Sequence, residues 1–148
     1  MCYTVLKQTR AAHFIPAIQQ QCFGRPCYPP MTKTQVERIL EQALSRLPLY
    51  FRRKIDNLVI VAQARPTAAQ RRKYGARLLG LYEGVPLPER GQNYSGAMPD
   101  KITIFYRNIE EDSTDARAVD ERLSHTLRHE LAHYFGIDDA RLLAKGNY

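Results

Sequence analysis

The first sustained pattern of apolar positions predicts a helix that starts at Thr34 and ends before Pro48. Thr34 is followed three residues later by Glu37, which is the spacing of a capping box at a helix start. Between the two ends, apolar residues recur three or four positions apart, the period of a helix with one buried face: Val36, Ile39, Leu40, Ala43, Leu44 and Leu47. Proline cannot continue a helix, so Pro48 closes the pattern.

Three apolar runs predict strands. Residues 57–64 are typical of a buried strand that ends before Pro66, and residues 77–85 are typical of a second strand whose glycines indicate a bend. A long loop at residues 86–100 is rich in Pro, Gly, Asn and Ser, and loops of this length are usually functional or mobile. After it, the sequence KITIFYR at residues 101–107 predicts the third strand.

A second helical pattern runs from about Asp115 to Phe135, and we expect Gly136 to end it. One stripe of this helix is apolar and must face the core: Leu123, Leu127, Leu131 and Phe135. A second stripe lies about 160° around the axis from the first and holds histidines at the same spacing: His125, His129 and His133. The two later histidines therefore project together from the face opposite the leucines.

One turn apart, His129 and His133 can both reach a single metal ion, and Glu130 lies about 100° around the helix, beside that ion. His-Glu-x-x-His on a helix is the arrangement of zinc hydrolases. Neutral imidazoles bind Zn²⁺ without quenching its charge, and the ion lowers the pKa of a bound water to about 7. A carboxylate beside that water can take its proton and pass it to a leaving amine, so Glu130 is the candidate base.

The candidate third ligand lies beyond this helix. Gly136 can adopt the left-handed conformation and turn the chain back toward the metal. Asp139, six residues past His133, can then bind the metal and leave a fourth position open for water, as a catalytic zinc site requires. We expect its neighbour Asp138 to face solvent or to form a local cap. The alternative is a surface helix end whose histidines only form hydrogen bonds.

Length and composition place the chain among single-domain globular proteins. It has 148 residues, of which 44% are hydrophobic and 25% are charged. No apolar run reaches the roughly 20 residues that cross a bilayer, and the N-terminus lacks the pattern of a signal peptide. We expect a cytoplasmic protein with no membrane partner, and a monomer.

The three cysteines argue against a disulfide framework. Cys2, Cys22 and Cys27 are an odd number in a chain without an export signal. Four residues separate Cys22 from Cys27, where a zinc knuckle usually has two, so metal binding there is disfavoured.

The net charge of +7 is unevenly distributed. Residues 1–33 carry four basic residues and no acid, whereas residues 34–148 carry 18 basic and 15 acidic residues. We interpret residues 1–30 as a disordered or non-native basic extension of a nearly balanced domain at residues 31–148, rather than as a nucleic-acid surface. The basic segment 64–77 is either a phosphate-binding patch or a solvated connection, and we favour the connection.

Several stretches resemble one family. HELAHYFGIDD at residues 129–139 matches the extended zincin motif HExxHxxGxxD. Together with IDNLVIV at 55–61, LLGLYEGVPLPER at 78–90 and PDKITIFYRNI at 99–109, it resembles a bacterial family of minimal zincin domains described as possible metallopeptidases. The likeness covers about residues 34–143.

The resemblance implies a compact α+β fold, in which a small mixed β-sheet packs on helices and the zinc-binding helix lies near the C-terminus. It implies one zinc ion held by His129, His133 and Asp139, with Glu130 as the base. It does not supply a substrate.

Two features depart from better-known relatives. The third ligand is Asp rather than the His of metzincins, and no methionine follows Met98, so a metzincin Met-turn is not expected. Residues 1–30 have no counterpart in the family, which makes Met31 a candidate start of the domain.

The favoured function is a zinc-dependent peptidase or amidase that acts on a peptide or protein substrate. Residues 101–107 would form an edge strand that pairs with an extended peptide. The loop 86–100 would form the far wall of the cleft. Tyr94 in that loop is a candidate to stabilise an oxyanion, although packing within the loop is its simpler role. His125 is not expected to be a ligand, and it either contacts substrate or is solvated.

Two other functions remain open. The first is a metal-dependent endoribonuclease, because the bacterial rRNA-maturation metalloproteins place three ligands at the offsets of the candidate ligands here, and basic charge suits RNA. Those motifs do not require Glu130, which has a clear role in peptide hydrolysis. The second is a non-catalytic zinc-stabilised or peptide-binding domain, against which stands the preference of structural zinc for four protein ligands.

Overall fold

The computed structural model describes residues 28–91, 94 and 98–144. The predicted extension at residues 1–30 therefore lies outside the described residues except for its last three positions, and the three cysteines lie outside them as well. The domain boundary at Met31 stays a prediction.

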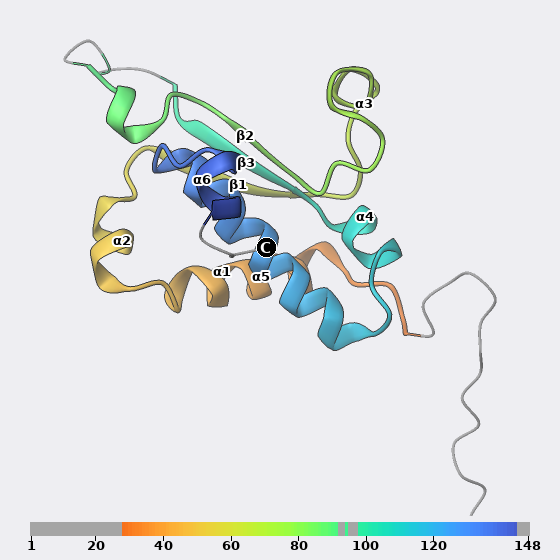
Figure 1. Ribbon diagram of the computed structural model, residues 1–148. Coiled ribbons are helices and arrows are strands. Elements are labelled where there is room, and N and C mark those ends of the chain that lie inside the picture. Colours follow the sequence, from red (N-terminus) through yellow and green to blue (C-terminus); the bar gives the residue numbers. More distant parts are fainter. Residues whose placement is uncertain (1–27, 92–93, 95–97, 145–148) are drawn as a thin grey trace, which may run out of the picture.

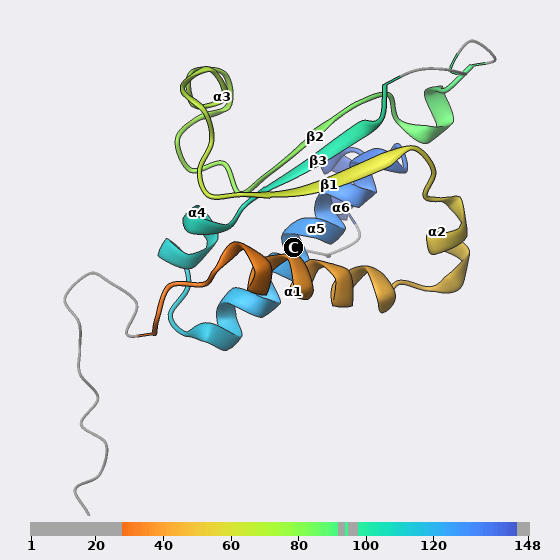
Figure 2. The same ribbon diagram turned by 180° about the vertical axis from the view of Figure 1, so that it is seen from behind.

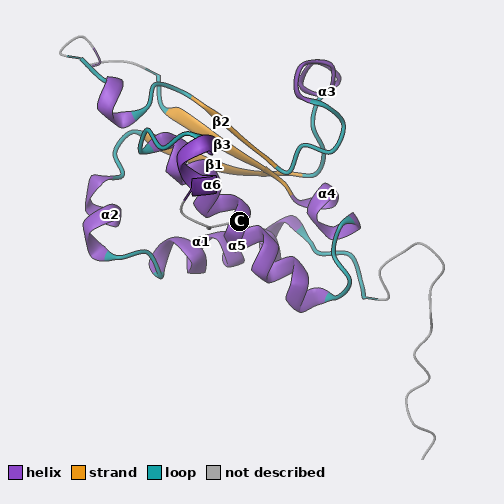
Figure 3. Ribbon diagram, viewed as in Figure 1, coloured by secondary structure: helices purple, strands orange, loops and turns teal. Residues whose placement is uncertain are grey.

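The described residues form α-helices, a short 3₁₀ helix and three strands (Figure 3). In chain order the elements are α1 (Lys33–Ser45), α2 (Leu49–Lys54), β1 (Leu58–Gln63), α3 (Ala68–Tyr74), β2 (Gly80–Glu83), η1 (Leu87–Glu89), β3 (Asp100–Phe105), α4 (Tyr106–Glu111), α5 (Ala116–Tyr134) and α6 (Asp139–Ala144). None of the helices in this part of the chain is long and apolar enough to cross a membrane.

The three strands form one mixed sheet in the order β1-β3-β2. β1 pairs with β3 in parallel, with Leu58 opposite Asp100, and β2 pairs with β3 in antiparallel, with Gly80 opposite Ile104. The expectation that residues 101–107 form an edge strand is wrong, because β3 lies between the other two strands. Its near-continuous burial is typical of a central strand, with Ile102, Ile104 and Phe105 fully buried.

Two long helices cover one face of the sheet. α1 and α5 pack on each other, with α1 beneath β1 and α5 beneath β2 and β3 (Figures 1 and 2). The core between the helices and the sheet consists of apolar side chains that are at most 8% exposed: Val36, Leu40, Ala43, Ala62, Ile102, Ile104, Tyr106, Ile109, Val119, Leu123, Leu127 and Leu131. The leucine stripe predicted for the second long helix is therefore confirmed, and the whole arrangement is the expected α+β fold.

The first helix starts two residues earlier than the sequence pattern predicts. Thr32, not Thr34, is the N-cap: its backbone is extended and its hydroxyl accepts a hydrogen bond from the backbone N–H of Gln35. The Gln35 side chain accepts the N–H of Thr32 at 2.8 Å, which completes the capping box. Thr34 and Glu37 share the spacing of a capping box but lie inside the helix, where Glu37 pairs with Lys33.

The other differences are short helices that the strand and loop patterns hide. The predicted strand at 77–85 contains only β2, and the predicted strand at 101–107 ends at Phe105 because Tyr106 begins α4. The basic segment 64–77 contains α3, which begins with a capping box between Thr67 and Gln70. α3 stands beyond the end of the sheet, away from the two long helices (Figure 1).

Candidate metal centre

The end of α5 turns the chain as the glycine predicts. Gly136 has φ 77°, in the left-handed region. Its N–H donates to the carbonyl of His133 and the N–H of Ile137 donates to the carbonyl of Ala132, both at 2.9 Å. This pair of bonds is a Schellman motif, which ends the helix and reverses the chain direction.

Packing also requires glycine at this turn. A Cβ on Gly136 would lie 2.8 Å from Cγ of Pro88 in η1, too close for a side chain. The chain then enters α6, where the Asp138 carboxylate accepts the N–H of Arg141 at 2.8 Å and so caps the helix. Asp139 is the first residue of α6, and its side chain projects back toward α5.

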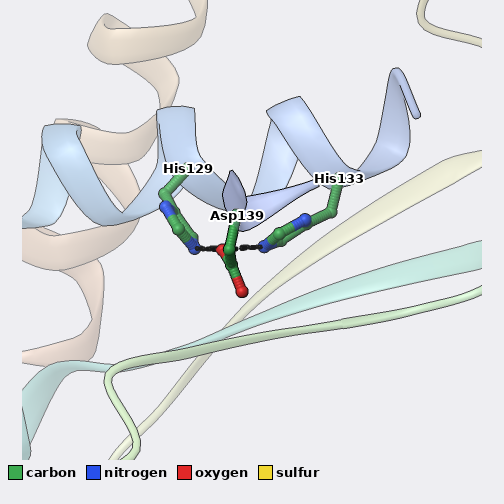
Figure 4. A group of neighbouring side chains, drawn as sticks. All are labelled: His129, His133 and Asp139. Carbon is green, nitrogen blue, oxygen red and sulfur yellow. Dashed lines mark hydrogen bonds and ion pairs between the residues drawn. The ribbon is translucent and has the colours of Figure 1, made fainter. Parts of the chain in front are cut away.

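Three side chains converge at this point (Figure 4). The Nε2 atoms of His129 and His133 are 3.0 Å apart, and each lies 3.3 Å from Oδ1 of Asp139. Ligand atoms about 2.0–2.1 Å from a tetrahedral zinc ion lie roughly 3.3 Å from one another. The three atoms therefore already have the separation of three corners of a zinc tetrahedron, and two imidazoles with one carboxylate are a donor set that zinc accepts.

Hydrogen bonding and burial keep the two imidazoles suited to a metal. Nδ1 of His133 is 3.1 Å from the carbonyl of Ile137, which can only accept, so this nitrogen carries the proton and Nε2 keeps its lone pair. Burial lowers the pKa of His129 most, and the neighbouring His133 lowers it further. The negative charge of Asp139 opposes this shift. The lowered pKa favours the neutral imidazole of His129, the form that binds metal.

Glu130 lies beside this group in a tight pocket. Its side chain is buried, and a Cβ on Gly80 of β2 would lie only 2.4 Å from Oε1 of Glu130. Burial raises the pKa of Glu130 to about 7. A hydrogen bond from the backbone of Tyr82 opposes this rise, and the negative charge of Asp139 adds to it. A carboxyl with a pKa near neutrality can both accept and return a proton.

Comparison with protein families matches this arrangement. The model of a family described as zincin-like metallopeptidase matches residues 55–147, which is more than half of the chain and includes the motif at 129–139. The chain belongs to the zincin-like metallopeptidase family. The resemblance inferred from the motif is therefore confirmed, and the His129, His133 and Asp139 group lies within the matched residues. No curated protein matches the chain.

In this zincin-like chain a cleft of about 1140 Å³ opens beside Glu130 and His129. One wall is the face of α5 from Ala118 to Glu130, and the other is the segment from Tyr74 to Gly80 that leads into β2. A smaller hollow of about 590 Å³ lies on the other side of His129 and is mainly apolar, with Phe51 and Phe135 among its lining residues.

The outer edge of β2 faces this centre. The Leu79 carbonyl accepts the N–H of Phe105, so the backbone groups of Leu79 and Leu81 point toward β3. Backbone groups alternate along an antiparallel strand, so those of Gly80 and Tyr82 point outward. This explains how the backbone of Tyr82 reaches the carboxylate of Glu130.

Two sequence candidates lie outside the group of His129, His133 and Asp139 in the zincin-like fold. The hydroxyl of Tyr94 donates to Asp100 at 2.9 Å and accepts from Asn57, and neither partner belongs to the metal group. These contacts support the packing role for Tyr94. His125 is exposed and borders both hollows, one turn before His129.

Sequence reasoning missed the residues that hold Glu130. Gly80 and Tyr82 are far from the motif along the chain, and only the packing of β2 on α5 brings them to it. The sequence of residues 78–90 predicted part of a strand with a bend and carried a family likeness, but it gave no sign of a contact with Glu130. The close approach of Pro88 to Gly136 was missed for the same reason, because the two residues are also far apart along the chain.

Proposed function

We propose that the chain is a zinc-dependent peptidase in which His129, His133 and Asp139 hold one zinc ion and Glu130 is the general base. The observation that carries the proposal is the convergence of three donor atoms at 3.0–3.3 Å beside a buried carboxyl. A purely structural zinc site usually has four protein ligands, whereas this group has three among the described residues, which would leave one corner for water.

The chain's own residues supply the proton transfers. A zinc ion bound here would act as a Lewis acid that polarises a carbonyl group and makes water more acidic. Glu130 accepts the proton of the attacking water and returns it to the departing amine. Burial raises its pKa toward neutrality, and the backbone of Tyr82 hydrogen-bonds to its carboxylate at the edge of the cleft.

The edge of β2 offers a place for the substrate backbone. The outward peptide group of Gly80 borders the cleft at Glu130, and that of Tyr82 reaches the Glu130 carboxylate. An extended peptide can add to such a strand edge through main-chain hydrogen bonds. β2 thus takes the role that the sequence pattern assigned to residues 101–107. The substrate carbonyl would then lie between the metal group and Glu130.

The test compares zinc content and hydrolysis in three proteins. The wild type should contain one zinc ion per chain by elemental analysis and cleave a mixed peptide library. His133→Ala should lose both properties. Glu130→Gln should keep the zinc ion and lose hydrolysis, because an amide does not accept the proton of water.

The alternatives give different outcomes in the same test. Cleavage of RNA by the wild type, unchanged in Glu130→Gln, would establish the endoribonuclease instead. Full zinc content with four protein ligands and no hydrolysis of any substrate would identify a zinc-stabilised binding domain.

A further inference from the structure

The cleft beside the candidate metal group has basic walls. Three arginines line it: Arg77, Arg122 and Arg128. Apart from Glu130, the cleft has one acidic residue, Glu121, whose carboxylate accepts a hydrogen bond from Arg117 at 2.9 Å. The charge of Glu121 is therefore already paired, and the cleft presents an excess of positive charge to a substrate.

Two of these arginines are available to bind an acid. Both Arg77 and Arg128 are exposed, and neither has a hydrogen-bond or ion-pair partner within residues 28–91, 94 and 98–144. Arg122 differs, because its guanidinium lies 3.6 Å from the carboxylate of Asp112 and donates to the Asp112 carbonyl at 3.2 Å.

The arginines lie within a few peptide residues of the candidate metal group. Arg128 is adjacent to His129 and borders both hollows. Arg77 is three residues before Gly80, which contacts Glu130, and so it lies on the opposite wall. Three residues of extended chain span about 10 Å. If the substrate bond to be cleaved lies at the metal group, a substrate side chain up to about three residues from that bond would thus lie beside an arginine.

We propose that this cleft selects peptides that carry Glu or Asp close to the bond to be cleaved, and that Arg77 and Arg128 select the acid. The inference rests on the proposed peptidase function and names its substrate class. Arginine pairs with a carboxylate through two parallel hydrogen bonds, and Leu78 and Leu79 provide an apolar surface for the rest of the side chain.

Phosphates also bind arginine, but the lining favours a peptide. Proteins that bind single-stranded nucleic acid usually stack several bases on aromatic side chains. Apart from the imidazoles of His125 and His129, Tyr74 is the one aromatic residue on the described walls of this cleft. The outward backbone groups of β2 suit a peptide backbone instead.

The first measurement is binding. Fluorescent peptides that differ at one position, with Glu, Gln or Lys placed in turn on each side of the central bond, are titrated into zinc-loaded Glu130→Gln protein. An exposed ion pair contributes up to roughly fivefold, so we expect the best Glu peptide to bind roughly fivefold more tightly than its Gln counterpart at low salt. Screening should reduce this preference at high salt.

Charge variants identify the residues. In the double variant Arg77→Gln with Arg128→Gln, the affinities for the Glu and Gln peptides should differ by no more than about twofold. Arg77→Glu with Arg128→Glu should reverse it in favour of the Lys peptide. The matched control is Arg38→Gln with Arg53→Gln, two exposed residues of α1 and α2, which makes the same charge change outside the cleft and should leave the preference unchanged.

The second measurement is kcat/KM of wild-type protein for the same peptides, which separates the two claims. Preferred binding of Glu peptides without hydrolysis would keep the acid selection and overturn the peptidase proposal. Hydrolysis with equal rates for Glu, Gln and Lys peptides at every position would overturn the selection and keep the peptidase. A single-stranded RNA that binds more tightly than every peptide, and loses binding in the Arg77 and Arg128 variants, would also overturn it.

Discussion

At the scale of single residues, two adjacent carboxylates past the helix end have different roles. Asp139 Oδ1 lies 3.3 Å from both imidazoles, while the Asp138 side chain accepts the N–H of Arg141. Neighbouring side chains at the start of a helix point in different directions, so only one of the two can face the metal group. Spacing from His133 selected Asp139 in the sequence, and the structure places that residue in the group.

Asp139→Ala should weaken zinc binding at least about 100-fold, because even the loss of an outer-shell partner of a ligand costs 10–100-fold. Asp138→Ala should lose about 1 kcal/mol of stability with the cap of α6, and keep its zinc affinity within a few-fold. Competition with a chromogenic chelator measures both affinities. The reverse ranking would mean that the turn at Gly136 presents Asp138 to the metal.

Gly80→Ala should separate zinc binding from catalysis. The added Cβ would lie 2.4 Å from Oε1 of Glu130 and 2.8 Å from Cγ2 of Thr126, so the carboxylate must move. A displacement of about 1 Å in a catalytic group can lower the rate roughly 100-fold, and we expect at least a tenfold fall in kcat/KM. Zinc content should stay at one per chain.

The control for Gly80→Ala is Gly91→Ala, whose added Cβ has nothing within 4 Å and should leave kcat/KM unchanged. Wild-type activity in Gly80→Ala would show that Glu130 is not held in place by β2.

At the scale of elements, a buried polar network joins β2, β3 and α5. Asp100 at the start of β3 accepts hydrogen bonds from Tyr82, Arg90 and Tyr94. The guanidinium of Arg90 also lies between two rings, 4.2 Å from the Tyr94 centroid and 4.8 Å from that of Tyr134 on α5. The network fixes the segment after β2 against the helix that carries the histidines.

This network predicts a loss of stability in acid. Burial alone would raise the pKa of Asp100, but the hydrogen bonds from Tyr82, Arg90 and Tyr94 together lower it below its usual value. A depressed folded pKa gives stability that is present above the unfolded pKa and lost as pH falls through the folded pKa. Asp100→Asn should therefore be less stable than wild type by about 3 kcal/mol at neutral pH, and the difference should shrink below pH ~4.

Urea unfolding at several pH values measures this difference. The matched control is Glu83→Gln, which removes an exposed pair with Lys101 and should change stability by less than about 1 kcal/mol. A stability difference for Asp100→Asn that is constant from pH 3 to pH 7 would contradict the role of its charge.

The elements show which parts of the fold local sequence can predict. The buried stripes of α1 and α5 follow from a period of 3.6, and the reversal at Gly136 follows from the conformational freedom of glycine. The order of the strands does not follow, because pairing depends on contacts between distant residues. The apolar run at 101–107 fits a central strand and an edge strand equally well, and only its pairing with β1 and β2 decides.

At the scale of the whole molecule, the last residues of the predicted extension touch the domain. The Tyr28 ring packs against the core, and its hydroxyl donates to the carbonyl of Glu110 at 3.2 Å. The backbone N–H of Met31 donates to the carboxylate of Glu110, which is buried. The sequence pattern could not reveal these contacts, because residues 1–30 show no period and Glu110 is 79 residues from Met31.

A chain that begins at Tyr28 should keep the melting temperature and zinc content of the full chain. A chain that begins at Met31 should also bind zinc, but the loss of the Tyr28 contacts should lower its melting temperature by about 3–6 °C, which corresponds to roughly 1 kcal/mol. Calorimetry of the three proteins measures this. A large drop for the chain that starts at Tyr28 would show that residues 1–27 stabilise the domain.

The central claim is that three side chains hold one zinc ion and leave one coordination position open beside Glu130. Anomalous diffraction measured on both sides of the zinc absorption edge, from a crystal grown with zinc, tests it most directly. We expect one peak, about 2.0–2.2 Å from Nε2 of His129, Nε2 of His133 and a carboxylate oxygen of Asp139, with no fourth protein ligand. A map with no peak at these atoms, or with a fourth protein ligand in the open position, would contradict it.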